Sequence, residues 1–280
     1  MKSMNDRGRK LDIKVLIKQI VYGAVIGVAN IIPGVSGGTM AVILNVYDKL
    51  IQSISNLKKD FIGSMKFLIP IGIGAGIGIL LFAKLIEFTL ANFNVATNLV
   101  FIGLIVGSIP MIYNKVQEEK VQIVPVLTFV VCLGIMIYMG VANPDDSAAQ
   151  IITSLTVGSF IKLFAASFIA AGAMIIPGIS GSFVLLLLGI YTSVLTAISN
   201  LNIMVLIPVA LGCAVGILVC AKIIDKLFQH FPQETYSGIL GLMVGSIFVI
   251  FPSFTFNVEL CVGVVLAIVA AVTAIGFSKK

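Results

Sequence analysis

The chain has 280 residues, of which 59% are hydrophobic and only 11% are charged, and its net charge is +6. Its mean hydropathy of +1.14 excludes an ordinary soluble domain, in which about 45–50% of residues are apolar and about 25% are charged. Apolar runs of about 20 residues recur without period-two alternation. They predict an all-α integral membrane protein rather than a β-barrel.

The first segment, residues 1–14, is basic. No aromatic residues are interleaved with its charges, so we predict a cytoplasmic flank that faces lipid rather than a nucleic-acid site. The basic residues that crowd this end of the chain are Lys2, Arg7, Arg9, Lys10, Lys14 and Lys18.

Two apolar segments are each broken by proline, glycine and small polar residues. IIPGVSGGTM interrupts residues 15–55, and IIPGISGSFV interrupts residues 160–199. After the first break only about nine apolar residues precede Asp48, and they would rise roughly 14 Å, half of the hydrocarbon thickness. We therefore predict a re-entrant helical hairpin for the first segment. The second segment is more apolar, and the sequence leaves open whether it is re-entrant or spanning.

The remaining apolar spans follow each broken segment in threes. Residues 17–57 align with residues 161–201 at an offset of 144, with 15 identities in 41 positions, and the match continues at an offset of 138. This duplication predicts two repeats, 15–142 and 143–280, an organisation typical of secondary transporters. The predicted spans are 66–90, 98–114 and 121–142 in the first repeat and 204–226, 236–252 and 257–277 in the second.

Lysines mark one side of the predicted bundle. The loops expected outside contain no Lys or Arg, which the positive-inside rule requires if both termini are cytoplasmic. Three spans separate the two hairpins, and this odd number predicts that the repeats are inverted. The lysines of the predicted inner loops and C-terminus are Lys58, Lys59, Lys115, Lys120, Lys226, Lys279 and Lys280.

The broken segments carry chemistry suited to an anion. Each break is followed by the start of a half-helix, where unpaired N–H groups and a partial positive charge favour phosphate. Glycines permit close approach, and hydroxyls add donors. The only histidine is His230, and the four cysteines lie inside apolar segments, so we predict neither a metal site nor a cofactor. No nucleophile with a base is evident, and we predict that the chain is not an enzyme.

IIPGVSGGT and IIPGISGSF, each followed by a Leu-rich stretch and a tyrosine, resemble the twin signatures of the prokaryotic polyprenyl-phosphate (undecaprenyl-phosphate) translocases, formerly a membrane family of unknown function. The resemblance implies a flippase that returns undecaprenyl phosphate from the outer to the inner leaflet of the cytoplasmic membrane, for recycling in cell-wall synthesis. Inverted repeats independently predict that two facing half-helix starts bind the phosphate head. The expected mechanism is alternating access, coupled to an ion or a proton.

Three groups of candidate residues follow. Phosphate binding is predicted for Gly34, Ser36, Gly37, Gly38, Thr39, Gly178, Ser180, Gly181 and Ser182, and Lys162 is added because it lies on the predicted outer side, against the charge rule. Charge or proton coupling is considered for Asn30, Asp48, Lys84, Glu87, Lys222 and Asp225. Close helix packing is predicted for the glycine pairs Gly74/Gly78, Gly103/Gly107 and Gly241/Gly245.

Several alternatives remain open. Lys84 and Lys222 occupy the same repeat position, each three residues before an acid. They either attract phosphate or form i,i+3 ion pairs while the lysine reaches the interface. Asp48 is either a solvated hairpin end or a coupling residue. For the whole chain, an inorganic-anion channel or exchanger is the main competing function, and a structural subunit is another.

Overall fold

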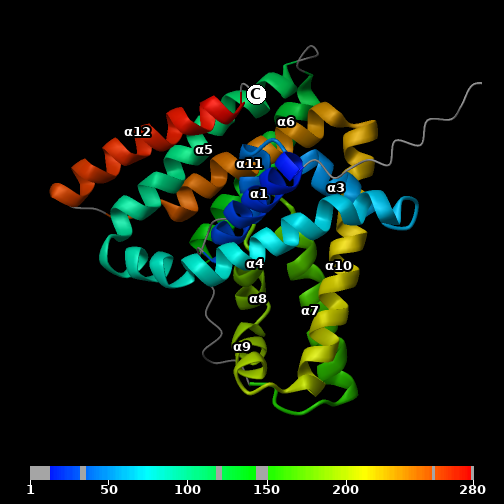
Figure 1. Ribbon diagram of the computed structural model, residues 1–280. Coiled ribbons are helices and arrows are strands. Elements are labelled where there is room, and N and C mark those ends of the chain that lie inside the picture. Colours follow the sequence, from blue (N-terminus) through cyan, green and yellow to red (C-terminus); the bar gives the residue numbers. More distant parts are fainter. Residues whose placement is uncertain (1–12, 32–35, 118–121, 143–150, 254–255, 279–280) are drawn as a thin grey trace, which may run out of the picture.

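The computed structural model describes residues 13–31, 36–117, 122–142, 151–253 and 256–278. These residues form helices and no strands, which confirms the all-α prediction (Figure 1). The helices are α1 (Ile13–Ile31), α2 (Gly37–Ile43), α3 (Tyr47–Ser55), α4 (Phe61–Asn92), α5 (Asn94–Val116), α6 (Ile123–Val141), α7 (Val157–Ile175), α8 (Gly181–Leu187), α9 (Tyr191–Ser199), α10 (Ile203–His230), α11 (Pro232–Ile250) and α12 (Val258–Ser278).

Eight of these helices are long and apolar enough to cross a membrane: α1, α4, α5, α6, α7, α10, α11 and α12. The six predicted spans fall on α4 to α6 and α10 to α12, with ends shifted by a few residues. The shift at α4 has a local cause, because the Asp60 carboxylate accepts the N–H of Gly63 at 2.9 Å and starts the helix at residue 61. The eight potential spans identify the chain as a multi-pass membrane protein.

The broken segments differ from the simple hairpins expected. α1 and α7 have 19 residues each, which rise about 28 Å and are long enough to span the bilayer by themselves. Each is followed by two short helices, of seven and nine residues. α8 and α9 are bent by 117° relative to each other. The prolines and glycines of the sequence mark both breaks, but the predicted hairpins did not include a preceding helix long enough to span the bilayer.

The first three helices recur in the second half. α1, α2 and α3 begin 144 residues before α7, α8 and α9, and the paired helices have equal lengths. The same turn ends both seven-residue helices, with Asn45 at φ 56° and Gly189 at φ 65°. Asparagine and glycine are the residues that best tolerate this left-handed conformation. The N–H groups of Val46 and Ile190 close the turns onto Ala41 and Leu185.

The long helices pack in matched pairs. α1 packs on α4 and α7 on α10 within the halves, whereas α5 packs on α12 and α6 on α11 between them. If the two halves are exchanged, the pair α5–α12 maps onto the pair α11–α6. α5 also packs on α11, its own equivalent in the other half. The halves are therefore interlocked at their centre.

Glycines let the paired helices approach closely. A Cβ added at Gly74, Gly103 or Gly241 would collide with a backbone carbonyl of the neighbouring helix. This confirms the packing predicted for the small-xxx-small pairs. The carbonyls belong to Ile20 of α1, Ala267 of α12 and Phe129 of α6.

The two broken segments are placed differently in the bundle. All seven residues of α2 are buried, and α2 contacts α5, α7 and α12, while α3 lies along α10. α8 packs on α7, and α9 packs on α10. Ile190 and Val194 belong to a separate cluster with Leu163 and Val205. Figure 1 shows α8 and α9 along the lower part of α7 and α10, away from α5 and α12. The first segment thus closes the centre, and the second stands to one side.

Candidate substrate site at the broken helices

The two sequence motifs touch each other although they are about 140 positions apart. The Thr39 hydroxyl accepts the N–H of Gly178 at 2.8 Å, in a buried contact. The Ser36 hydroxyl donates to the carbonyl of Ile176 at 3.4 Å. Ser36 and Thr39 are 2% and 1% exposed. The structure therefore brings both motifs to one place inside the bundle.

In the first motif, nearby side chains accept the free N–H groups at the start of α2. The N–H of Gly37 donates to the Asn30 Oδ1 at 3.0 Å, and the N–H of Gly38 donates to the Ser36 Oγ at 3.1 Å. Asn30 thus reaches forward from the end of α1 to cap α2. An anion at this helix start would have to replace these two acceptors. The predicted residue Gly34 lies outside the described residues.

The second motif leaves its helix start open. Ser180 is the N-cap of α8, but no side chain accepts an N–H there in the described part of the chain. Its hydroxyl lies 2.9 Å from that of Ser182, which is exposed. Gly178 has φ 91°, and a Cβ there would lie 2.8 Å from the Leu242 carbonyl, so only glycine fits. Gly178 and Ser180 also line a cavity of about 20 Å³, which is enough for a water molecule.

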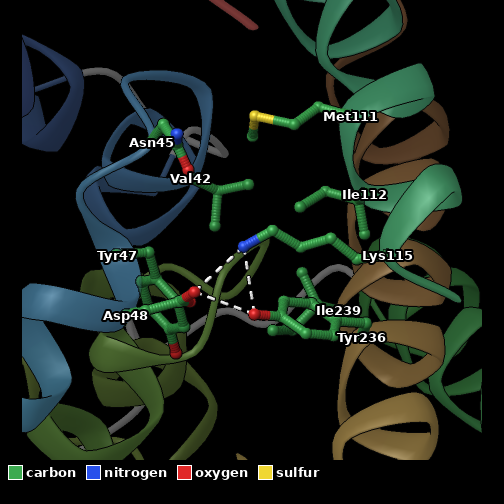
Figure 2. Close-up of a pocket in the computed structure, with 9 residues that line it drawn as sticks. All are labelled: Val42, Asn45, Tyr47, Asp48, Met111, Ile112, Lys115, Tyr236 and Ile239. Carbon is green, nitrogen blue, oxygen red and sulfur yellow. Dashed lines mark hydrogen bonds and ion pairs between the residues drawn. The ribbon is translucent and has the colours of Figure 1, made fainter. Parts of the chain in front are cut away.

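A polar cluster joins three elements from both halves (Figure 2). The Lys115 Nζ lies 2.9 Å from the Asp48 Oδ2 and 3.0 Å from the Tyr236 hydroxyl, which itself donates to Asp48 at 2.8 Å. These residues come from α5, α3 and α11. The side chains of Lys115 and Asp48 are 26% and 40% exposed, so water screens the ion pair in part.

Aromatic rings extend this cluster toward α10. Tyr47 makes an edge contact with Phe228 at 6.0 Å between ring centroids, and Phe228 lies 5.0 Å from Tyr236. The Tyr47 hydroxyl is buried and has no hydrogen-bond partner among the described residues. Tyr47 therefore packs the start of α3 onto α10.

Comparison with known proteins decides the family. A family profile described as "Undecaprenyl phosphate translocase-like" matches residues 26–261, which is most of the chain. The chain belongs to this family. A "Polyprenyl-phosphate transporter" of Staphylococcus aureus is 33% identical over 249 residues, covering 85% of this chain and 87% of the relative. A protein of the same name from Vibrio cholerae is 31% identical over 245 residues, covering 82% and 76%. No solved structure matches the chain.

The fold does not bring every predicted residue to the motifs. Lys162 is exposed on α7, thirteen residues before Ile175, so roughly 20 Å of helix separates it from the break. Lys84 is exposed on α4, and the side chain of Glu87 lies outside the described set. Membership in a translocase family agrees with the prediction that the chain is not an enzyme.

Two of the residues considered for coupling, Lys222 and Asp225, lie together at a different place. Lys222 is exposed, and Asp225 is only 6% exposed; both line a cavity between α3 and α10, away from the motifs. The sequence also missed two residues of the polar cluster. Lys115 appeared only as an inner lysine at the end of a span, and Tyr236 carried no signal, because only the packing of α5 on α11 brings them together. Among the described residues, no group of three His, Cys, Asp or Glu could hold a metal.

Proposed function

We propose that this chain carries polyprenyl phosphate between the leaflets of the cytoplasmic membrane. The observation that supports the proposal is the direct contact of the two broken motifs, Thr39 with Gly178, in a bundle of eight potential spans. Both curated relatives bear the name of a polyprenyl-phosphate transporter. The long isoprenoid tail stays in lipid, so the protein needs a polar path for only the phosphate head.

The phosphate head binds first at the second motif. The start of α8 offers N–H groups that no side chain caps in the described structure, together with the hydroxyls of Ser180 and Ser182. A helix start of this kind favours negative charge. The first motif supplies the same donors once Asn30 and Ser36 release Gly37 and Gly38. The head would then pass from one motif to the other across the Thr39–Gly178 contact.

The transport direction is from the outer to the inner leaflet. The lysine distribution predicts that both termini and the end of α3 lie inside, and inverted repeats would present the two motifs to opposite leaflets. The two segments are in different positions, one docked at the centre and one at the side. Exchanging these positions would expose the site to the other leaflet, which is alternating access.

The Asp48–Lys115–Tyr236 cluster is the proposed coupling element. It ties α3 to α5 and α11 in the docked position. A proton or cation at Asp48 would weaken its attraction to Lys115 and so favour release of α3. This cluster therefore gives an ion a way to change the balance between the two arrangements.

Leaflet exchange in liposomes tests the site. Polyprenyl phosphate is placed in one leaflet, and its appearance in the other is followed for the parent protein and for the Ser180→Ala, Ser182→Ala double variant. Loss of hydrogen bonds to a charged group costs about 1.5–3 kcal/mol each, so exchange should slow at least tenfold. Thr273→Ala is the control, because the Thr273 hydroxyl donates to the Val269 carbonyl within α12. Equal rates in the double variant and the parent would remove the assigned site, and no exchange in the parent would refute the function.

A further inference from the structure

A separate polar groove lies where the first hairpin ends. Its volume is about 450 Å³. Its walls come from the end of α3, the turn that follows it and the last three turns of α10. The α10 residues Lys222, Asp225, Lys226 and Gln229 follow i, i+3, i+4, i+7 spacing and so share one face of the helix. Asn56 and Lys59 face them from the hairpin side.

The groove is positively charged, and part of its lining is apolar. Three lysines and one aspartate line it, so its lining charge is +2. Lysine ammonium groups are point charges suited to phosphate, and the amides of Asn56 and Gln229 add donors. The same wall continues into Val219 and Ile223, which are 38% and 53% exposed. A charged pocket beside exposed apolar side chains suits a phosphate that carries a hydrocarbon tail better than a free ion.

We propose that this groove binds the phosphate head of a polyprenyl phosphate at the membrane face where α3 ends. The inference rests on the proposed function and adds a second site to it. The head leaves the broken helices, rests against Lys222 and Lys226, and enters the leaflet with its tail along Val219 and Ile223. By the lysine distribution this face is the cytoplasmic one.

Sequence duplication repeats two members of this residue set, Asn56 and Lys222. Asn200 stands 144 positions after Asn56, and Lys84 stands 138 positions before Lys222, so the same side chains recur in the opposite halves. In this arrangement α3 of the first half lies along α10 of the second half. Its equivalent, α9, instead packs on α8 and α10, which belong to its own half. The groove therefore belongs to one arrangement of the hairpins. Docking of α9 on α4 would bring Asn200 and Lys84 together at the other face.

Photocrosslinking locates the lipid. A photoreactive amino acid replaces Gln229 in the full-length protein in liposomes containing polyprenyl phosphate, and mass spectrometry identifies the attached lipid. The groove variant is Lys222→Gln with Lys226→Gln, the two lysines proposed to hold the head. The matched control is Lys58→Gln with Lys66→Gln, which removes the same charge from exposed positions outside the groove. Competition with phosphatidylglycerol and with inorganic phosphate separates a specific lipid head from any anion.

The expected result is a polyprenyl phosphate adduct that falls about 10- to 30-fold in the groove variant, since each lysine beside an anionic head contributes a factor of about five. The control variant should keep the adduct within twofold. Neither competitor at equal concentration should displace it. Equal adducts in the groove and control variants, no adduct, or displacement by either competitor would overturn the inference. Failure of leaflet exchange in the parent protein would instead refute the proposed function, so the two failures are distinguishable.

Discussion

Replacement of Thr39 by valine tests the contact between the two motifs. Thr39 is 1% exposed, and its hydroxyl is the acceptor for the buried N–H of Gly178. Valine has nearly the same shape but offers no acceptor. Thr39→Val therefore leaves the Gly178 N–H without a partner inside the protein, whereas Thr39→Ser keeps the hydroxyl and loses one methyl group.

The two variants separate hydrogen bonding from apolar burial. An unsatisfied buried donor costs about 1–3 kcal/mol, and one buried methyl group contributes about 0.8 kcal/mol. We expect the free energy of unfolding to decrease in the order parent, Thr39→Ser, Thr39→Val. Apolar burial alone predicts the reverse order for the two variants, because valine buries more hydrocarbon than serine.

The assay is thermal unfolding in detergent, followed by far-UV circular dichroism, together with leaflet exchange in liposomes. Thr39→Val should have the lowest unfolding midpoint and the slowest exchange of the three proteins. Thr39→Val as stable as the parent, or more stable than Thr39→Ser, would contradict the account of the motif contact.

Three further predictions concern packing and charge. A double-mutant cycle on Asp48→Asn and Lys115→Gln should give a coupling of about 0.5–1 kcal/mol, because the pair is partly exposed; strictly additive effects on unfolding would deny the ion pair. Gly74→Ala should lower stability by about 1–3 kcal/mol, whereas Gly76→Ala, which meets nothing within 4 Å, should gain about 0.5–1 kcal/mol. The opposite ranking in thermal unfolding would refute the α1–α4 packing. Gly178→Ala should lower the unfolding midpoint and slow exchange, since its φ is 91° and a Cβ has no room; unchanged values of both would speak against that geometry.

Much of the fold follows from the sequence because length and apolar content decide which segments can span a bilayer. The spans predicted at 66–90 and 204–226 lie inside α4 and α10. The offset of 144 residues found in the sequence reappears as the offset between α1 and α7. The prolines and glycines marked the breaks, but they did not show that the helix before each break is long enough to span the bilayer.

The site was less predictable, because its contacts join distant parts of the chain. Asn30 was considered for coupling, and nothing in its local sequence shows that it caps Gly37 beyond the break. Lys115 and Tyr236 meet only because α5 packs on α11. Lys162 was predicted to bind phosphate because of its charge and its predicted outer side, but helix geometry separates it from the motif. Periodicity describes single helices, and tertiary pairing has no comparable local signal.

The central claim is that the chain moves a lipid phosphate head across the bilayer rather than conducting free anions. The most direct measurement compares two rates in the same liposomes that contain the parent protein: exchange of polyprenyl phosphate between leaflets and flux of inorganic phosphate or chloride. We predict protein-dependent lipid exchange with anion flux no greater than in protein-free liposomes. Anion flux without lipid exchange would contradict the account and identify an anion channel or exchanger instead.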